Sequence, residues 1–313
     1  MIAKKPPPAK QARFRDLART VIEHHFGSPP HRMVFKSSGL SNFVFEAKHK
    51  EGSFIVRVSP EAAGMSLFLK EQWAQREAAK AGVPTAEILE VGTAVIPYPY
   101  MIVRSVIGTE ATFHTKRLEI IREMGRYAAK INAVKTKGYG GTFDWSQNKL
   151  SRSDTWKNYL QDEYAYEEKL EILEKHKAIS QQQTKQLRKI FRDAANMTPR
   201  TSLNHGDIRL KNVMVDESGK IIAIIDWENC TSNLAPQWEL SLALHDLGID
   251  EKQQFVDGYG LKPKTLIEIA PLVKAFNMLN YASEIVQLAA AKNNAGIEKI
   301  RARMSGFFDM YTL

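Results

Sequence analysis

Three side chains suited to metal and phosphate chemistry lie close together in the stretch LNHGDIRLKNVMVDESGKIIAIIDWEN, residues 203–229. They are Asp207, Asn212 and Asp226. Carboxylate and amide oxygens are the hard ligands that Mg²⁺ prefers, and two such protein ligands leave room for water and substrate phosphates. The remaining carboxylate could then accept a proton from a reacting hydroxyl group. The alternative is that each residue only caps a turn at a strand end, which is the commoner role for any one of them alone.

The elements around these residues predict how they would be brought together. The runs NVMVD and KIIAIID are apolar and β-branched, and ESG with Gly219 joins them, so they predict a β-hairpin. Antiparallel pairing would bring Asn212, at the start of the first strand, and Asp226, at the end of the second, to the same end of the hairpin. Asp207 would lie on the loop that leads into it. In this order and spacing, the three residues favour one chemical site over three unrelated turns.

The rest of the chain predicts a small antiparallel sheet with one inserted helix, followed by a larger, mainly helical part. The first ten residues are rich in Pro and Lys and predict a disordered tail. The elements expected after them are a helix over 12–26, three strands with turns over 33–60, a helix over 67–82, strands over 84–92 and 97–108, and helices beyond 115 apart from the hairpin at 212–226. This is an α+β pattern.

The motif HGDIRLKN followed by IIDWEN resembles the aminoglycoside phosphotransferase and choline kinase-like family. The resemblance implies a bilobal protein-kinase-like fold, with a small antiparallel-sheet N-lobe that contains one helix and a larger, mainly helical C-lobe. We expect residues 1–104 to hold the basic tail, the leading helix and the nucleotide-binding N-lobe. Residues 105–313 would hold the hinge and the C-lobe, with the catalytic loop, the metal-binding hairpin and the acceptor pocket.

The same resemblance implies a role for each residue of the motif. Asp207 becomes the catalytic base, and Asn212 and Asp226 become the ligands of Mg²⁺. Arg209 falls where protein kinases carry a Lys that contacts the transferring phosphoryl group, and a solvated loop Arg is an equal alternative. His205 is expected to hold the loop by packing and hydrogen bonding rather than to transfer protons.

In the N-lobe, KSSGLSNFVFEA occupies the place of the phosphate-covering loop. Gly39, Ser41 and Asn42 could offer donors to phosphate oxygens there, although a plain hairpin turn would have the same sequence. Arg57, on the third strand, replaces the Lys that is usual in the family, and Glu77 is expected to be its partner on the helix. The alternative is an exposed strand Arg and an unrelated Glu.

Two further assignments follow from the resemblance. YPYMIVRSVIG would form the strand and hinge, where backbone groups from Arg104 to Val106 would hydrogen-bond the edge of adenine. Glu239 stands where the family usually has a shorter Asp, so its support of the catalytic loop could differ. Together with Arg57, this makes two departures from the family pattern.

The function that the resemblance implies is transfer of the γ-phosphoryl group from ATP, with Mg²⁺, to an alcohol group of a small molecule. The acceptor could be an aminoglycoside, a macrolide, a sugar or an amino alcohol. A polycationic aminoglycoside would need an acidic lining, which residues 154–174 with Glu228, Asp246 and Asp250 could provide. No long activation segment follows IDWEN, which argues against a protein substrate. The alternative function is a catalytically silent kinase-like scaffold that binds nucleotide or a partner protein.

Composition limits the other classes of function. A net charge of +9 over 313 residues could indicate nucleic-acid binding, but most of the excess lies in the first third of the chain, and residues 154–174 are acidic on balance. No apolar run approaches the roughly 20 residues of a membrane helix, and the start lacks the apolar region of a secretory signal. With one cysteine, Cys230, we expect a cytoplasmic protein without a membrane partner. The sequence does not predict the oligomeric state.

Overall fold

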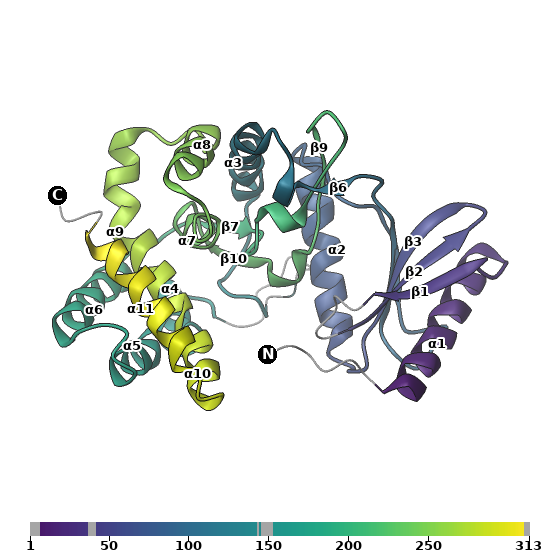
Figure 1. Ribbon diagram of the computed structural model, residues 1–313, viewed down its shortest axis with the longest axis horizontal. Coiled ribbons are helices and arrows are strands. Elements are labelled where there is room, and N and C mark those ends of the chain that lie inside the picture. The colour runs from purple at the N-terminus through teal and green to yellow at the C-terminus, as the bar shows by residue number, and fades with distance from the viewer. Residues whose placement is uncertain (1–6, 37–41, 143, 145–152, 310–313) are drawn as a thin grey trace. The chain divides into compact units, whose positions relative to one another are not determined.

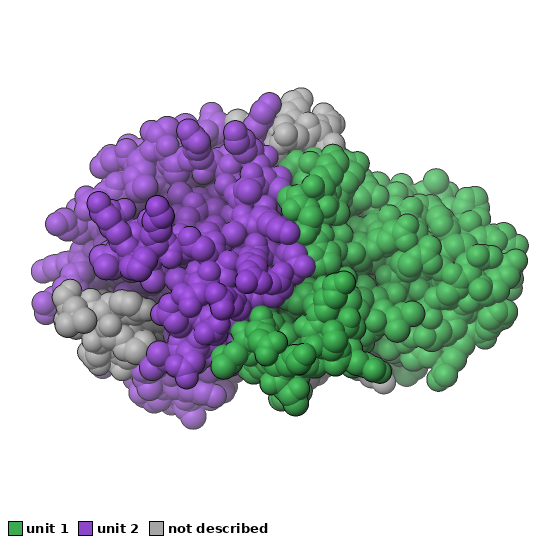
Figure 2. All heavy atoms as spheres, turned by 90° about the horizontal axis from the view of Figure 1, so that it is seen from above, with its two compact units in different colours: residues 1–120, 144–147, 210–230 green, residues 121–143, 148–209, 231–313 purple. Residues whose placement is uncertain are grey.

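The computed structural model describes residues 7–36, 42–142, 144 and 153–309, and the side chains only as far as residue 304. The chain forms two compact units (Figure 2). Unit 1 contains residues 1–120, 144–147 and 210–230, and unit 2 contains residues 121–143, 148–209 and 231–313. The expected α+β architecture is confirmed, because unit 1 is built on an antiparallel sheet and unit 2 is mainly helical (Figure 1).

Unit 1 has a five-stranded antiparallel sheet with the order β1-β2-β3-β5-β4. The turn at Gly52, where φ is +126°, joins β2 to β3 and needs a residue without a Cβ atom. The first part of unit 1 consists of α1 (Pro8–Phe26), β1 (Arg32–Lys36), β2 (Phe43–His49), β3 (Gly52–Val58), α2 (Gly64–Lys80), β4 (Ile88–Gly92) and β5 (Tyr100–Arg104).

The helix α1 follows the sequence signals closely. It begins with a proline in its first turn and ends at Gly27, whose φ of +70° gives a left-handed cap. Its apolar face is buried against alternating apolar side chains of the sheet, in a core that includes Phe14, Phe45 and Phe54. The rings of Phe14 and Phe43 stack with their centroids 3.9 Å apart.

A second, three-stranded sheet with the order β6-β8-β9 completes unit 1. The predicted hairpin is confirmed as β8 and β9, with Val213 opposite Ile224. The turn between the strands is held by the Asp216 carboxylate, which accepts hydrogen bonds from the N–H groups of Ser218 and Lys220. This part of unit 1 consists of β6 (Thr109–Glu110), the short helices η1 (Ala111–Phe113), η3 (Leu210–Asn212) and η4 (Trp227–Asn229), β8 (Val213–Val215) and β9 (Ile221–Ile224).

The hairpin packs with unit 1, although we expected it in the second domain, and unit 1 continues to residue 120 rather than 104. Long-range pairing explains the difference. Strand β6 pairs with β8 through Thr109 and Val215, and the N–H group of Ile224 donates to the carbonyl oxygen of Pro84 at 2.8 Å. The hairpin is therefore attached on two sides to residues from the first third of the chain.

Unit 2 is built around helices and one short two-stranded sheet, β7 with β10, which the sequence did not predict. Helix α3 begins within the last residues of unit 1. The elements are α3 (Arg117–Ala133), α4 (Trp156–Asn158), the π-helical turn η2 (Tyr159–Glu163), α5 (Tyr166–Lys175), α6 (Gln181–Ala195), β7 (Thr201–Asn204), β10 (Thr231–Leu234), α7 (Gln237–Ala243), α8 (Ile249–Tyr259), α9 (Pro263–Asn280), α10 (Ala282–Ala290) and α11 (Asn294–Asp309).

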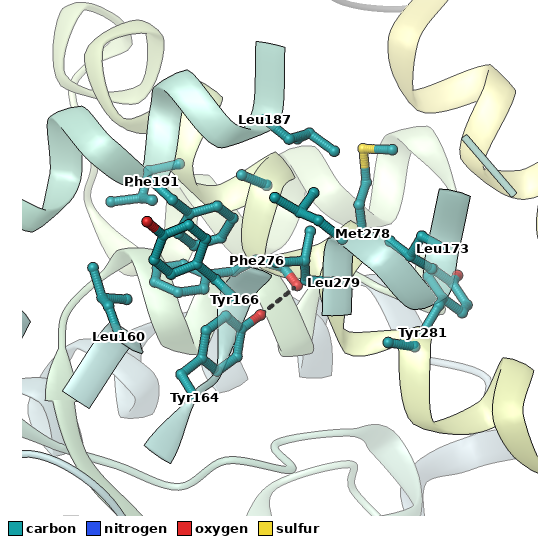
Figure 3. Packing of buried hydrophobic residues seen from close by; sticks show 14 of the residues in the cluster. Leu160, Tyr164, Tyr166, Leu173, Leu187, Phe191, Phe276, Met278, Leu279 and Tyr281 are labelled. Atoms are coloured by element: carbon teal, nitrogen blue, oxygen red, sulfur yellow. Dashed lines mark hydrogen bonds between the residues drawn. The ribbon is translucent and has the colours of Figure 1, made fainter. Parts of the chain in front are cut away.

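An aromatic core holds the helices of unit 2 together (Figure 3). Phe276, from α9, packs edge-on against Tyr164 and Phe191, with ring centroids 5.3 Å and 5.5 Å away. The Tyr164 hydroxyl donates to the carbonyl oxygen of Phe276 at 3.4 Å, so its polar end is satisfied inside the core (Figure 3). Within the described residues, no helix combines the length and the apolar character that crossing a membrane requires.

Candidate active site

The loop that carries Asp207 follows β7 in unit 2, and side chains hold its backbone N–H groups. Asp207 is only 8% exposed, and its N–H group donates to Nδ1 of His205 at 3.2 Å. Gly206 between them has a φ of +78°, a conformation that glycine adopts without strain. The fully buried His205 therefore acts as a hydrogen-bonding support of the loop, as its position in the sequence predicted.

The side chain of Glu239, from α7, binds backbone N–H groups of the same loop. Its Oε2 atom accepts a hydrogen bond from the N–H group of His205 at 2.6 Å, and Oε1 accepts one from the N–H group of Gly206 at 3.3 Å. The carboxyl group is fully buried. Glu239 thus reaches the two residues that precede Asp207, and the longer side chain supports the loop although the family usually has Asp here.

Glu239 is expected to make the stability of the protein depend on pH. Burial raises the pKa of its carboxyl group from 4.5 to about 7, although the N–H groups of His205 and Gly206 oppose the shift. Because the folded protein holds this proton more tightly than the unfolded chain, the free energy of unfolding is expected to fall as pH rises from 4.5 through about 7. The fall should be at most about 3 kcal/mol.

Urea denaturation between about pH 5 and pH 8 measures this effect when the wild-type protein is compared with Glu239→Gln. The variant has no proton to lose at this position, so its stability should lack this part of the decline. Unfolding curves that shift in parallel with pH for the two proteins would show that Glu239 does not titrate in this range.

Arg209 is tied to carboxylates rather than free in solvent. Its guanidinium group pairs with the carboxylate of Asp207 and lies 3.5 Å from that of Asp246. Burial acts against its charge, but these two carboxylates hold the pKa of Arg209 above its usual value. A permanent positive charge therefore lies beside Asp207, and contact of Arg209 with a transferring phosphoryl group stays a prediction.

The two predicted metal ligands belong to unit 1 and lie at one end of the hairpin, as the sequence predicted. Val213 pairs with Ile224, and the N–H group of Ile225 donates to the carbonyl oxygen of Asn212 at 2.9 Å. Asn212 is buried and Asp226 half-buried. This donor set fits Mg²⁺, which is bound in such sites by one or two side-chain oxygens together with phosphates. Across the described parts of the chain, no group of three His, Cys, Asp or Glu side chains could hold a metal without such help.

The backbone at Asp226 has an uncommon conformation. Its φ of 67° and ψ of 59° lie in the left-handed region, where Asp and Asn are the most frequent residues after Gly. The next residue, Trp227, is fully buried, and its indole N–H group donates to the carbonyl oxygen of Ile224 at 2.9 Å. Contacts on both sides therefore fix the peptide groups around the carboxylate.

The predicted pair of Arg57 with Glu77 is wrong, because Arg57 pairs with Glu71. Its Nη1 atom donates to Oε2 of Glu71 at 2.6 Å, and Nη2 lies 3.5 Å from the carboxylate of Glu228. Although burial opposes its charge, the carboxylates of Glu71, Glu228 and Asp226 hold the pKa of Arg57 above its usual value. Glu77 pairs instead with Lys80, one turn further along α2.

The two glutamates should differ strongly in their contribution to stability. Glu71 is 1% exposed, so Glu71→Gln would leave the buried guanidinium without its main counter-charge and is expected to lower the free energy of unfolding by about 3 kcal/mol. Glu77→Gln would remove a surface pair, which contributes about 0–1 kcal/mol. Thermal or urea unfolding of both variants measures the difference. Equal losses would mean that the buried pair of Arg57 and Glu71 contributes no more to stability than the surface pair of Glu77.

The other residues predicted to contact the nucleotide have different outcomes in the structure. Asn42 lies in a bend just before β2, whereas Gly39 and Ser41 lie outside the described residues. The N–H group of Arg104 donates to the carbonyl oxygen of Glu87 at 2.8 Å, so it is used within the sheet and is not available to adenine. Val106, two residues beyond the end of β5, stays a prediction for this role.

The comparisons with known proteins agree with the fold and show the family. The family profile described as the phosphotransferase enzyme family (APH) matches residues 34–266. No curated protein matches the chain. Many solved structures do match, and those described next are aminoglycoside or macrolide phosphotransferases.

Three solved structures illustrate the likeness in fold. A thermostable mutant of aminoglycoside phosphotransferase APH(4)-Ia is 19% identical with a TM-score of 0.68, and the match covers 94% of this chain and 99% of that one. The GDP and kanamycin complex of APH(2")-IIia is 15% identical with a TM-score of 0.64, covering 93% and 98%. Macrolide 2'-phosphotransferase MphH from Brachybacterium faecium is 13% identical with a TM-score of 0.59, covering 91% and 97%.

Proposed function

Because the chain belongs to the phosphotransferase enzyme family, we propose that it transfers the γ-phosphoryl group of ATP to a hydroxyl group of a small-molecule acceptor. The observation that carries the proposal is the buried carboxylate of Asp207, on a loop whose N–H groups are held by Glu239. A loop whose backbone is held by these hydrogen bonds is suited to carry a catalytic base, because small displacements of such a group reduce the rate strongly.

In the proposed reaction, Asp207 orients the acceptor hydroxyl and takes its proton. The acceptor oxygen forms a bond with the γ-phosphorus while the bond from that phosphorus to the bridging oxygen breaks, so ADP leaves. Asn212 and Asp226 would hold Mg²⁺, which would neutralise charge on the phosphate oxygens. Arg209, whose charge is secured by Asp207 and Asp246, would stabilise negative charge near the reacting group.

Several acidic side chains that could line an acceptor site are already bound to other groups of the protein, and this limits the charge of the acceptor. Asp246 pairs with Arg209, and Glu167 pairs with Arg188 at 2.7 Å. Glu163 accepts a hydrogen bond from the N–H group of Gly141, and Glu228 lies beside Arg57. Three of these carboxylates are therefore already paired with arginines, which reduces the negative charge left for a polycation and favours an acceptor of low positive charge, such as a sugar or a macrolide.

The test is consumption of nucleotide by the purified protein with Mg²⁺ and either ATP or GTP. The acceptors are aminoglycosides, macrolides, neutral sugars and amino alcohols, tested in parallel, and phosphorylated product is identified by mass spectrometry. We expect turnover with ATP and one acceptor class, and loss of that turnover in Asp207→Asn. Turnover with aminoglycosides alone would contradict the preference for acceptors of low charge.

The scaffold alternative predicts a different result, namely nucleotide binding without any acceptor-dependent consumption. Its support from the sequence was the presence of Arg57 and Glu239 at two positions. Both residues make buried contacts, Arg57 with Glu71 and Glu239 with the loop that carries Asp207. These contacts favour the enzyme over the scaffold.

A further inference from the structure

Lys70, on α2, is a buried lysine with a defined partner. It is 6% exposed, and its Nζ atom donates a hydrogen bond of 2.8 Å to the main-chain carbonyl oxygen of Glu228. Lysine is almost never buried to this degree unless its ammonium group is paired, because the loss of hydration is costly. A contact with the main chain, rather than with a side chain, means that Lys70 fixes the path of the backbone at Glu228.

The segment that Lys70 holds follows Asp226 directly. Three interactions surround the left-handed peptide at Asp226. The N–H group of Ile225 donates to Asn212, the indole of Trp227 donates to Ile224, and the ammonium group of Lys70 binds at Glu228. The first two bonds lie within the hairpin and its continuation. Only the third, among these, connects the segment to another helix.

Two cations link helix α2 to this segment: Lys70 of α2 itself, and Arg57 of β3, which pairs with Glu71 of α2. Arg57 pairs with Glu71 of α2 and also lies near the Glu228 carboxylate, while Lys70, the neighbour of Glu71, binds the Glu228 carbonyl group. The side chain and the main chain of one residue are thus held at the same time. A shift of α2 would therefore move the peptide that follows Asp226.

We propose that Lys70 is a positioning residue that holds the carboxylate of Asp226 in place for Mg²⁺ through the main-chain carbonyl group of Glu228. The inference rests on the proposed function, since it assigns Asp226 to the metal bound with the nucleotide. In this role Lys70 acts through the main chain of Glu228 and not as a ligand of the metal. Its removal should weaken binding of the nucleotide only when Mg²⁺ is present.

The experiment measures the affinity of a fluorescent ATP analogue with Mg²⁺ and with EDTA, for wild type and for Lys70→Met. Methionine keeps the length of the apolar stem and removes the ammonium group. The gain in affinity that Mg²⁺ provides is expected to fall about ten- to a hundred-fold, the loss typical of a buried hydrogen bond to a charged group. Affinity in EDTA should change little. Lys80→Met, on the exposed end of α2, is the matched control and should behave as wild type.

A purely structural role would give another pattern. Lys70→Met would then lower the melting temperature but leave the Mg²⁺-dependent gain in affinity as in wild type, which would overturn the inference. In an Asp226→Asn background, Lys70→Met should cause no further loss of that gain, and a further loss of similar size would also overturn it. Lys70→Gln replaces Lys70→Met if the methionine variant does not fold. A wild-type protein that binds no nucleotide would instead overturn the proposed function itself.

Discussion

The Asp207→Asn variant is expected to lose about 10²–10⁴-fold in kcat with little change in its affinity for ATP. An amide cannot accept the proton of the acceptor hydroxyl, so the variant keeps the shape of the group and loses its basicity. The N–H group of Asp207, which binds His205, belongs to the backbone and is unaffected by the change. The loop should therefore keep its path.

Steady-state kinetics with the acceptor found in the panel measure this loss, with nucleotide binding recorded on the same sample. Asp193→Asn, on the exposed face of α6, is the matched control and should retain wild-type kcat. If Asp207→Asn retained most of its kcat, Asp207 would not be the base, and proton transfer to solvent would have to be considered.

The second large effect is expected for Asp226→Asn, which should lower kcat/KM by about 10³-fold or more, since a bound metal supplies several kcal/mol of charge stabilisation. Asn tolerates the left-handed conformation that Asp226 adopts, with φ at 67°, so the backbone should not be strained by the change. An Ala variant would strain the backbone in this conformation and also remove the ligand, so the two effects could not be separated. Asn is therefore the cleaner substitution.

Titration with MgCl₂ separates a metal-binding defect from a general loss. In Asp226→Asn, the Mg²⁺ concentration for half-maximal rate should rise far above that of wild type. Asp257→Asn, an exposed carboxylate on α8, serves as the control and should follow the wild-type curve. An unchanged Mg²⁺ requirement together with a low rate would mean that Asp226 does not bind the metal.

The part of the site that lies close together in sequence was predictable. The apolar, β-branched runs and the turn at Gly219 predict a hairpin, and antiparallel pairing places Asn212 and Asp226 at one end of it. Both the type and the geometry of these elements are local properties. The same holds for α1, with proline in its first turn and Gly27 at its end.

The error over Glu77 has a geometric cause. Glu71 and Glu77 are six positions apart on α2, which turns the helix by about 240° between them, so only one of them can face β3. A signal was present, because Glu71 falls in the apolar stripe of α2 together with Phe68, Ala74 and Ala78. An acid in the buried stripe of a helix needs a cationic partner, and this would have selected Glu71 as the partner of Arg57.

Other features could not be read from local pattern. Strands β7 and β10 have only four residues each, TSLN and TSNL, and pair across a separation of about thirty positions. Their polar composition resembles a loop. The pairing of Arg209 with Asp246 likewise depends on the packing of α7 and its C-terminal end against the loop, which no spacing rule in the sequence reveals.

The division of unit 1 into distant segments has a consequence for biosynthesis. Strand β6 acquires its partner β8 only after the ribosome has passed residue 215, and Ile224 reaches Pro84 later still. The sheet that carries Arg57 can form early, but Lys70 has no Glu228 to bind until about half of unit 2 has also been synthesised. In the nascent chain, Lys70 therefore lacks its hydrogen-bond acceptor through much of translation. Unit 1 becomes complete only late, through contacts between residues far apart in the sequence.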